Sequence, residues 1–344
     1  MRPFHATISA LKLDEFKEIY PLTIKSLHAP MLRTIIIYLS QAEWARQIVM
    51  RFPLARRTAV RFVAGENLED ALKVVDDLNS QGYQVTLDLL GEHTANKSEA
   101  TESTRQILQV IDSISSTDLR ASISIKLTQI GLKLNEQLCA NNLSKILELA
   151  KANSIFVRID MEEAACVDAT LRLANGSEIK RMDNLGLVIQ SYLYRSEADT
   201  ASLLEEGFTI RLVKGAYKES SELAYPKKTD VDASFDRLTS QLLKASPATK
   251  RNFNWPPVAA IASHDENRVE FATTKAAELG VPKNQVEFQM LYGIRRDLQR
   301  DLLGEGYPVR IYVPFGKEWY PYFMRRLAER PANLWFFISN LIRK

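Results

Sequence analysis

The segment ASISIKL (residues 121–127) decides the fold, because it is a short β-rich run that is followed by a turn and a helical pattern. The same order recurs along the chain. Strands that alternate with helices indicate βαβ units and a parallel sheet, and strands apolar throughout are typical of a sheet covered on both faces. The predicted strands occupy residues 84–90, 121–127, 156–160, 185–193, 208–214, 258–263, 286–291 and 309–315.

The number of these units predicts an α/β fold, a (β/α)8 TIM barrel. A doubly wound sheet is the alternative, but it usually carries a Gly-rich phosphate loop, and neither GxGxxG nor GxxxxGK[ST] occurs. We expect residues 1–80 to form an N-terminal helical arm and residues 81–344 to form the barrel. RFVAGE (61–66) is predicted to end one helix and residues 66–82 to form another. Further helices are predicted at 103–114, 143–152, 233–245 and 267–280.

Composition excludes several classes of protein. The 344 residues carry a formal charge of only +3, which argues against a nucleic-acid binder. Two cysteines, Cys139 and Cys166, make neither a disulfide framework nor a zinc site. The N-terminus shows no signal-peptide pattern, and the apolar runs at 35–39 and 334–338 are too short to span a bilayer. We therefore expect a cytoplasmic protein. Contact of the apolar, basic-ended tail 332–344 with the inner face of the membrane is the alternative.

Polar residues at the ends of the predicted strands are the candidates for function, because a barrel of this kind has its active site at the carboxyl ends of its strands. Nearly every strand supplies one. They are Glu92, Lys126, Asp160, Gln190, Arg211, Lys214, His264, Gln289 and Tyr312.

Each candidate also has a purely structural interpretation. Asp160 with Glu163, and Ser263 with Glu266, have the form of a helix capping box. Yet Lys126 lies inside a strand, and buried charges need partners or a ligand.

The segment YFMRRLAERP (322–331) adds a polar helical stripe of Tyr322, Arg325, Arg326 and Glu329. The two arginines could lie on a solvated helix face. Because paired arginines also suit a carboxylate or phosphate, the sequence predicts a small anionic substrate and leaves the reaction open.

In this order, the strand-end motifs resemble those of the proline dehydrogenase family, and of its single-function bacterial form in particular. The resemblance extends from residue 61 to about Pro331. The motifs are LDLLGE (87–92), SIKLT (124–128), IDMEEA (159–164), GLVIQSYLYR (186–195), RLVKGAY (211–217), SHDE (263–266), EFQMLYG (287–293), VRIYVPFG (309–316) and WYPYFMRRLAE (319–329).

The resemblance implies FAD over the open end of the barrel and no metal. It puts Arg211 near the reactive N5 of the flavin and Asp160 near flavin and substrate, as the catalytic pair. It places the last helix over the active site. The other cofactor-binding residues that it implies are Met161, Gln190, Lys214, Gly215, Ala216, Ser263, His264 and Glu329.

For the substrate, the resemblance implies L-proline, with its carboxylate on Lys126, Arg325 and Arg326 and with Glu92 as an ion-pair partner behind the arginines. Four residues would surround the ring: Tyr217, Leu291, Tyr312 and Tyr322. Hydride transfer to the flavin would give 1-pyrroline-5-carboxylate, the first step of proline catabolism to glutamate. A membrane quinone would accept the electrons. A separate pyrroline-5-carboxylate dehydrogenase would act next, since no second catalytic region follows.

Three alternatives stay open. Hydroxyproline oxidation lies within the same class, and Tyr312 argues against it because a bulky ring leaves little room for the extra hydroxyl. A metal-dependent barrel hydrolase would use Asp160, His264 and Glu92, but no HxH or HExxH occurs. A non-catalytic anion-binding module would use RRDLQR (295–300).

Overall fold

The computed structural model describes residues 61–91, 94–176, 179, 182–246 and 255–329, with the backbone alone of 327–329. The chain divides into two compact units. One comprises residues 59–319. The other comprises residues 1–58 and 320–344.

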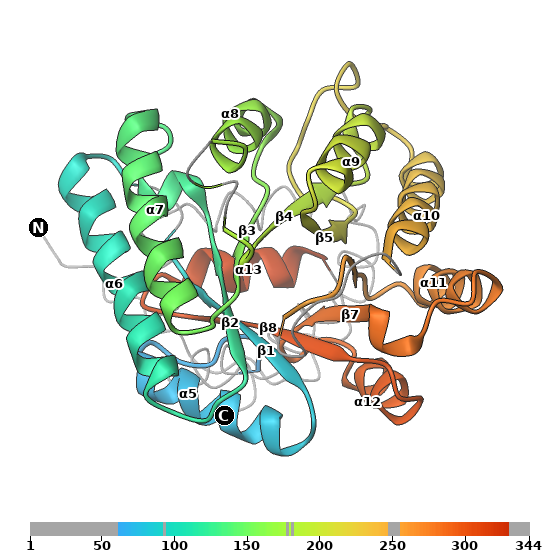
Figure 1. Ribbon diagram of the computed structural model, residues 1–344, viewed down its shortest axis with the longest axis horizontal. Helices are drawn as coiled ribbons and strands as arrows, with labels where there is room; N and C mark the ends of the chain where they lie inside the picture. Colours follow the sequence, from blue (N-terminus) through green and yellow to red (C-terminus); the bar gives the residue numbers. More distant parts are fainter. Residues whose placement is uncertain (1–60, 92–93, 177–178, 180–181, 247–254, 330–344) are drawn as a thin grey trace, which may run out of the picture. The chain divides into compact units, whose positions relative to one another are not determined.

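The first unit is a closed barrel of eight parallel strands in sequential order, as the sequence predicts. Figure 1 shows the strands at the centre with helices around them. The last strand pairs with the first over six residues, which closes the ring. The strands are β1 (Gln84–Leu89), β2 (Ala121–Ile125), β3 (Val157–Ile159), β4 (Leu185–Gln190), β5 (Thr209–Val213), β6 (Ala259–Ala262), β7 (Val286–Leu291) and β8 (Val309–Phe315).

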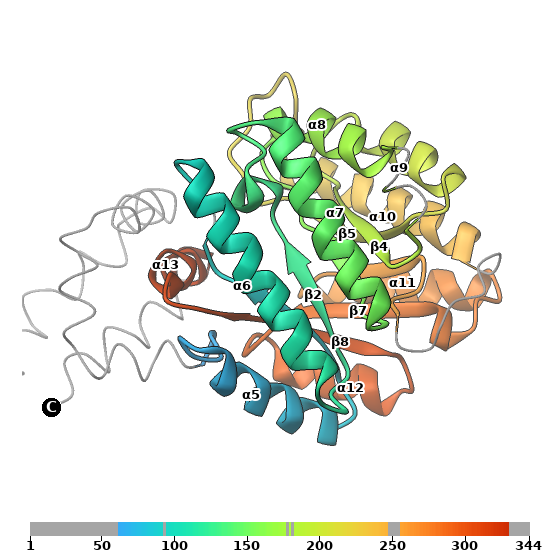
Figure 2. The same cartoon turned by 60° about the vertical axis from the view of Figure 1, so that its left-hand side comes forward.

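Helices follow the strands and cover the outside of the barrel (Figures 1 and 2). Their apolar stripes face inward: in α6, Ile107, Val110, Ile111 and Ile114 are buried at the spacing of one helical face. The helices of this unit are α5 (Leu68–Ser80), α6 (Lys97–Ser115), α7 (Glu136–Ala152), α8 (Ala164–Ala174), α9 (Ser196–Glu205), α10 (Lys228–Ala245), α11 (Glu266–Glu278) and α12 (Arg296–Gly304), with short 3-10 turns η1 (Leu127–Ile130) and η4 (Lys283–Gln285).

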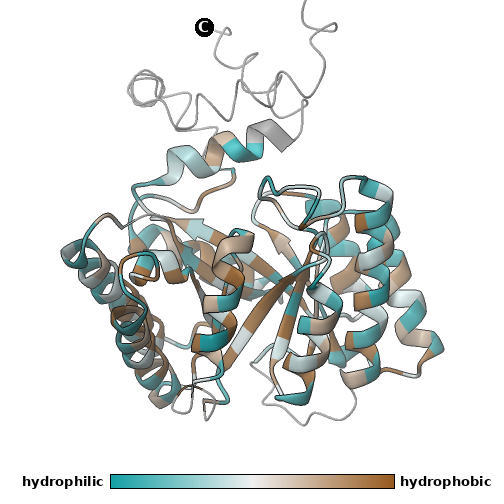
Figure 3. Ribbon diagram, turned by 90° about the horizontal axis from the view of Figure 1, so that it is seen from above, coloured by the Kyte–Doolittle hydropathy of each residue, from teal (hydrophilic) through white to brown (hydrophobic). Residues whose placement is uncertain are grey.

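Alternate residues of each strand point in opposite directions. Val85 and Leu87 of β1 belong to the main hydrophobic core, whereas Thr86 and Asp88 are buried polar residues that pair in register with Ser122 and Ser124 of β2. In Figure 3 the strands are mostly in the colours of apolar residues, with polar positions among them, and the surrounding helices carry both polar and apolar residues. The sequence interpretation of strands apolar on both faces is therefore wrong in part, because the barrel interior is largely polar.

The predicted helix at 66–82 is confirmed as α5, which begins after the cap residue Asn67. Residues 61–65 form a turn and an irregular stretch that hydrogen-bonds to the end of β8, through Ala64 N to Pro314 O at 2.9 Å and Gly316 N to Gly65 O at 2.9 Å. The helix that this stretch was expected to end lies outside the described residues.

The last described helix is α13 (Trp319–Glu329), which enters the second compact unit after Trp319. It confirms a helix at 322–329. The predicted place of α13 over the active site stays a prediction. The predicted domain boundary at residue 80 also stays a prediction.

Candidate active site

Arg211 is the centre of a polar cluster inside the barrel. It is only 5% exposed. Its Nη1 donates to Asp160 Oδ1 at 2.7 Å and to Ser124 Oγ at 3.1 Å, and its Nε donates to Gln289 Oε1 at 2.5 Å. Asp160 follows β3, Ser124 is in β2 and Gln289 in β7, so residues far apart in sequence hold one guanidinium. The barrel topology brings these side chains together.

Asp160 also receives a hydrogen bond from Tyr312, whose hydroxyl lies 2.6 Å from Oδ2. The guanidinium of Arg211 lies over the Tyr312 ring at 5.2 Å from its centroid. Burial, and next the charge of Asp160, raise the pKa of Tyr312 well above its ordinary value. The hydroxyl therefore stays protonated and available as a donor at neutral pH.

Lys126 lies between two carboxylates. Its Nζ is 3.1 Å from Asp88 Oδ1 and 3.7 Å from Asp160 Oδ2. Asp88 is buried, which raises the pKa of its carboxyl, while the neighbouring Lys126 opposes that rise. The cluster thus joins two acids to two cations in a largely buried site, where an anionic ligand could compete for the cations.

A further buried ion pair lies next to this cluster. Arg310 of β8 donates from Nε to Glu287 Oε1 at 2.9 Å and from Nη2 to Oε2 at 3.1 Å. Each side chain is 2% exposed. Glu287 Oε1 also accepts from Gln289 Nε2 at 2.5 Å, so the pair is connected to Arg211 through one amide.

At the end of β5, Lys214 contacts two acids that stand at the start of the following helices. Its Nζ lies 2.5 Å from Asp232 Oδ1 and 2.6 Å from Asp265 Oδ2, and Lys228 also pairs with Asp232. Burial would raise the pKa of both carboxyls, but the hydrogen bonds from Lys214 outweigh it and the pKa of each is lowered. Next to Lys214, Gly215 adopts φ +109°, and a Cβ there would lie 2.7 Å from Cγ of Tyr192.

The capping interpretations of Asp160 and Ser263 are wrong. Helix α8 begins after Glu163, and helix α11 is capped by Asp265, whose side chain accepts from Asn267 N. Ser263 instead accepts a hydrogen bond from Asp265 N at 3.1 Å. Beside it, His264 Nε2 accepts from Leu291 N at 3.0 Å, so His264 is oriented by the end of β7.

A model of the family described as proline dehydrogenase matches residues 71–338. The chain belongs to the proline dehydrogenase family. Proline dehydrogenase 1 of Bacillus subtilis (strain 168) is 39% identical over 314 residues, which is 91% of this chain and 100% of the relative. Proline dehydrogenase of Deinococcus radiodurans is 40% identical over 294 residues, 83% of this chain and 90% of the relative. The chain is thus an enzyme of this family.

Among solved structures, proline utilization A (PutA) from Bdellovibrio bacteriovorus, inactivated by N-propargylglycine, is similar with a TM-score of 0.74 and 24% identity. The similarity covers 87% of this chain and 36% of that chain, so this chain spans about a third of it. This likeness supports the barrel fold.

Within this family member, the structure places most of the predicted site residues at or next to strand ends. Met161 is buried with Val188 and Tyr192, and Gln190 donates to Glu162 O at 2.9 Å. Ala216 and Tyr217 are exposed.

The remaining predicted residues cannot be placed in this cluster. Glu92 and the side chain of Glu329 lie outside the described residues. Tyr322, Arg325 and Arg326 belong to the second compact unit, in which Arg326 lies over the Tyr322 ring at 5.1 Å.

The donor set of the barrel suits an anionic, nitrogen-rich cofactor such as a flavin. In the described residues, the hydrogen bonds of Arg211 use Nε and Nη1, and Nη2 makes none. One edge of the guanidinium can therefore donate to a bound group. Lys214 is less clearly suited to bind the cofactor, because Asp232 and Asp265 already neutralise its charge.

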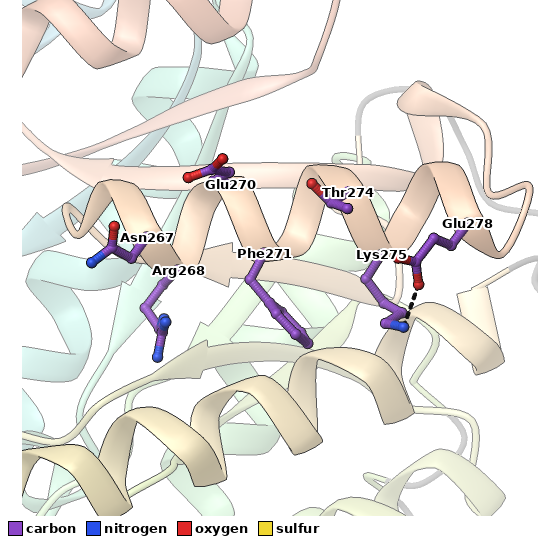
Figure 4. A pocket seen from close by; sticks show the side chains of 7 residues that line it. All are labelled: Asn267, Arg268, Glu270, Phe271, Thr274, Lys275 and Glu278. Atoms are coloured by element: carbon purple, nitrogen blue, oxygen red, sulfur yellow. Dashed lines mark hydrogen bonds and ion pairs between the residues drawn. The ribbon is translucent and has the colours of Figure 1, made fainter.

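No group of three or more His, Cys, Asp or Glu side chains that could hold a metal occurs among the residues described. In the same residues, no helix is long and apolar enough to cross a membrane. A shallow groove lies along α11 (Figure 4) and contains none of the predicted site residues.

Sequence reasoning missed Asp88, Glu287 and Arg310. All three lie inside strands rather than at their ends. A signal was present for Glu287 and Arg310, which share a strand face with the predicted site residues Gln289 and Tyr312, two positions away. Asp88 pairs in register with Ser124, two positions before Lys126, so its signal depends on the register of β1 and β2.

Proposed function

We propose that the protein oxidises L-proline to 1-pyrroline-5-carboxylate with FAD as cofactor and a quinone as electron acceptor. The observation that carries the proposal is the convergence of Lys126, Asp160, Arg211 and Tyr312 inside the barrel of a proline dehydrogenase family member. FAD, when bound, would accept the hydride that leaves C5 of the ring, and the ring nitrogen would lose its proton to complete the imine.

The carboxylate of proline would bind to Lys126, together with Arg325 and Arg326 of α13. Lys126 is held by Asp88 and is therefore oriented before substrate arrives. Fixing the carboxylate fixes the ring, and proximity would supply a large part of the rate. The ring would lie among the side chains of Tyr217, Leu291, Tyr312 and Tyr322.

Asp160 would act by orienting its neighbours. It accepts hydrogen bonds from Arg211, Tyr312 and Ser124, so one carboxylate fixes both the guanidinium proposed to face the flavin and the ring proposed to face proline. Replacing Asp160 would loosen both at once.

FAD would be held by Arg211 at the reactive ring, with Gln190, Ser263, His264, Lys214, Gly215, Ala216 and Met161 around it. Glu329 would reach the ribose, and Glu92 would stand behind the two arginines. Lys214 could take part only by sharing its charge with Asp232 and Asp265, which already contact it.

An absorbance spectrum tests the proposal. The purified protein, reconstituted with FAD if needed, should show the flavin bands and lose them when proline is added without oxygen. A preparation that cannot bind FAD, or whose flavin stays oxidised with proline, would contradict it. Hydroxyproline is the comparison substrate. Faster bleaching by hydroxyproline than by proline would identify hydroxyproline as the substrate instead.

The proposed product is a reactive cyclic imine, so a separate pyrroline-5-carboxylate dehydrogenase would have to consume it. A peripheral contact of the tail 332–344 with a membrane that contains quinone stays a prediction, and that tail lies outside the described residues. Liposome binding before and after removal of the tail checks it.

A further inference from the structure

A continuous line of hydrogen bonds runs through the barrel from Arg310 to Asp160. Arg310 binds both oxygens of Glu287, Glu287 Oε1 accepts from Gln289 Nε2, and Gln289 Oε1 accepts from Arg211 Nε. Arg211 then donates to Asp160. Every link is formed by side chains, and four of the five residues are at most 5% exposed.

The direction of this line is set by Glu287. An amide has one donor and one acceptor end, so Gln289 could present either to Arg211. Only the oxygen can accept from Arg211 Nε. A carboxylate accepts only, so Glu287 selects the nitrogen of Gln289 and leaves the oxygen for Arg211.

Arg310 gives Glu287 both its neutralising charge and its position. It also donates to Val85 O at 3.0 Å and to Ser122 Oγ at 3.1 Å, so the pair is fixed to β1 and β2. A buried ion pair adds little net stability compared with apolar residues of similar volume. Stability therefore does not account for this pair, whereas the fixed orientation of an amide does.

We propose that Glu287 is a positioning residue for Arg211: acting through the amide of Gln289, it directs the guanidinium that would face the flavin. The place of Arg211 beside the flavin rests on the proposed function. The positioning of Arg211 by Glu287 does not.

The substitution Glu287→Gln tests this with almost no change of shape. Whichever way the new amide points, its nitrogen meets a donor. With its nitrogen at the Oε2 position, the new amide opposes Arg310 Nη2 and loses one of the two contacts that fix it, although its oxygen still faces Gln289. With its nitrogen at the Oε1 position, it opposes both Arg310 Nε and Gln289 Nε2 and favours rotation of the Gln289 amide, so that a donor faces Arg211 Nε.

The kinetic test separates positioning from simple stability. Glu287→Gln should lower the rate of flavin reduction by proline at least about tenfold, since hydrogen bonds to charged groups contribute about 1.5–3 kcal/mol. The proline KM should stay within about twofold, because only steps beyond ground-state binding are affected. In a Gln289→Met background, Glu287→Gln should have no further effect on the rate, because the amide through which it acts is gone.

The control is Thr209→Val, which removes a different buried hydrogen bond, from Arg158 Nη1 at 3.2 Å. It should lower stability without lowering the reduction rate. If Glu287→Gln fails to fold, Glu287→Met with Arg310→Met replaces the ion pair by apolar side chains and should show the same loss of rate.

A second readout needs neither FAD nor proline. Solvent exchange of the Arg211 Nε–H, assigned by NMR with Arg211→Lys, should become at least about tenfold faster in Glu287→Gln and stay unchanged in Thr209→Val, because the N–H loses its acceptor. Unchanged exchange in both Glu287→Gln and the Glu287→Met, Arg310→Met double variant, or additive effects of Glu287→Gln and Gln289→Met on rate, would overturn the positioning role. A wild-type flavin that proline does not bleach would overturn the proposed function, while the exchange experiment would still decide the role of Glu287.

Discussion

Lys126 Nζ lies 3.1 Å from Oδ1 and 3.2 Å from Oδ2 of Asp88, so both oxygens of one buried carboxylate share one ammonium. Asp88 is 1% exposed and Lys126 8%. The cation that we propose for substrate binding is therefore held in place by a residue of the first strand.

Replacing Asp88 with Ala should lower the free energy of unfolding by about 3 kcal/mol, because it removes the nearer carboxylate from a buried cation. Urea unfolding of the FAD-free protein measures this change. Asp76→Ala, at an exposed position of α5, is the control and should change stability by less than about 0.5 kcal/mol. Equal stability of both variants would show that the Asp88–Lys126 pair is not needed for folding.

Gly186 is the position where the barrel interior tolerates no side chain. A Cβ there would overlap Thr209 and Arg158 and would lie 2.7 Å from Phe156 Cζ. Gly186→Ala should therefore lower the free energy of unfolding by about 3 kcal/mol, the cost of overpacking a filled interior. Gly304→Ala is the matched control, since nothing lies within 4 Å of its added Cβ.

The ion pairs of Lys214 predict how stability depends on pH. The folded-state pKa of Asp232 lies below its ordinary value of 3.8, because hydrogen bonds from Lys214 and Lys228 outweigh burial. A carboxyl with a lowered pKa contributes stability that is present above its unfolded pKa and is lost as pH falls through the folded value.

The stability difference between wild type and Asp232→Asn should thus be constant from about pH 5 to 8 and shrink below about pH 4. Urea unfolding across this range checks it. Asp118→Asn, an exposed residue without an ion pair in the described part of the chain, should show a small difference at each pH. A gap between wild type and Asp232→Asn that persists at pH 3 would contradict the assignment.

The arginines of α13 carry a prediction about the substrate. Arg325→Met or Arg326→Met should each raise the proline KM about 10- to 100-fold, because each would remove the proposed charge-assisted hydrogen bond to the carboxylate. FAD content should not change. Arg300→Met, on the exposed face of α12, is the control and should leave KM unaltered. Unchanged proline affinity in both variants would remove these arginines from the site.

All eight strands could be predicted, because each is a short β-rich run bounded by turns and followed by a helical pattern. The convergence of Lys126, Asp160, Arg211 and Tyr312 followed from that topology, since strand ends of a barrel meet. The partners could not be predicted in the same way. Whether Lys214 meets Asp232 and Asp265 depends on how two long connections fold back, which local patterns do not encode.

The interior acids and bases escaped prediction for another reason. Glu287 and Arg310 pair across β7 and β8, and their match is visible only when the register of the two strands is known. In a linear sequence, the face that each shares with Gln289 or Tyr312, two positions away, indicates that it points to the barrel axis, but nothing local says which residue it pairs with.

Arg310 contacts Val85 O across 225 positions of sequence. A ribosome makes the chain from its N-terminus, so β1, β2 and β7 leave the exit tunnel before Arg310, the residue that joins them. Until then Glu287 is a carboxylate without Arg310, in an open sheet whose first strand has no neighbour on one side. Arg310 therefore arrives together with β8, the strand that closes the barrel. Neutralisation of Glu287 and closure of the barrel become a single late event in biosynthesis.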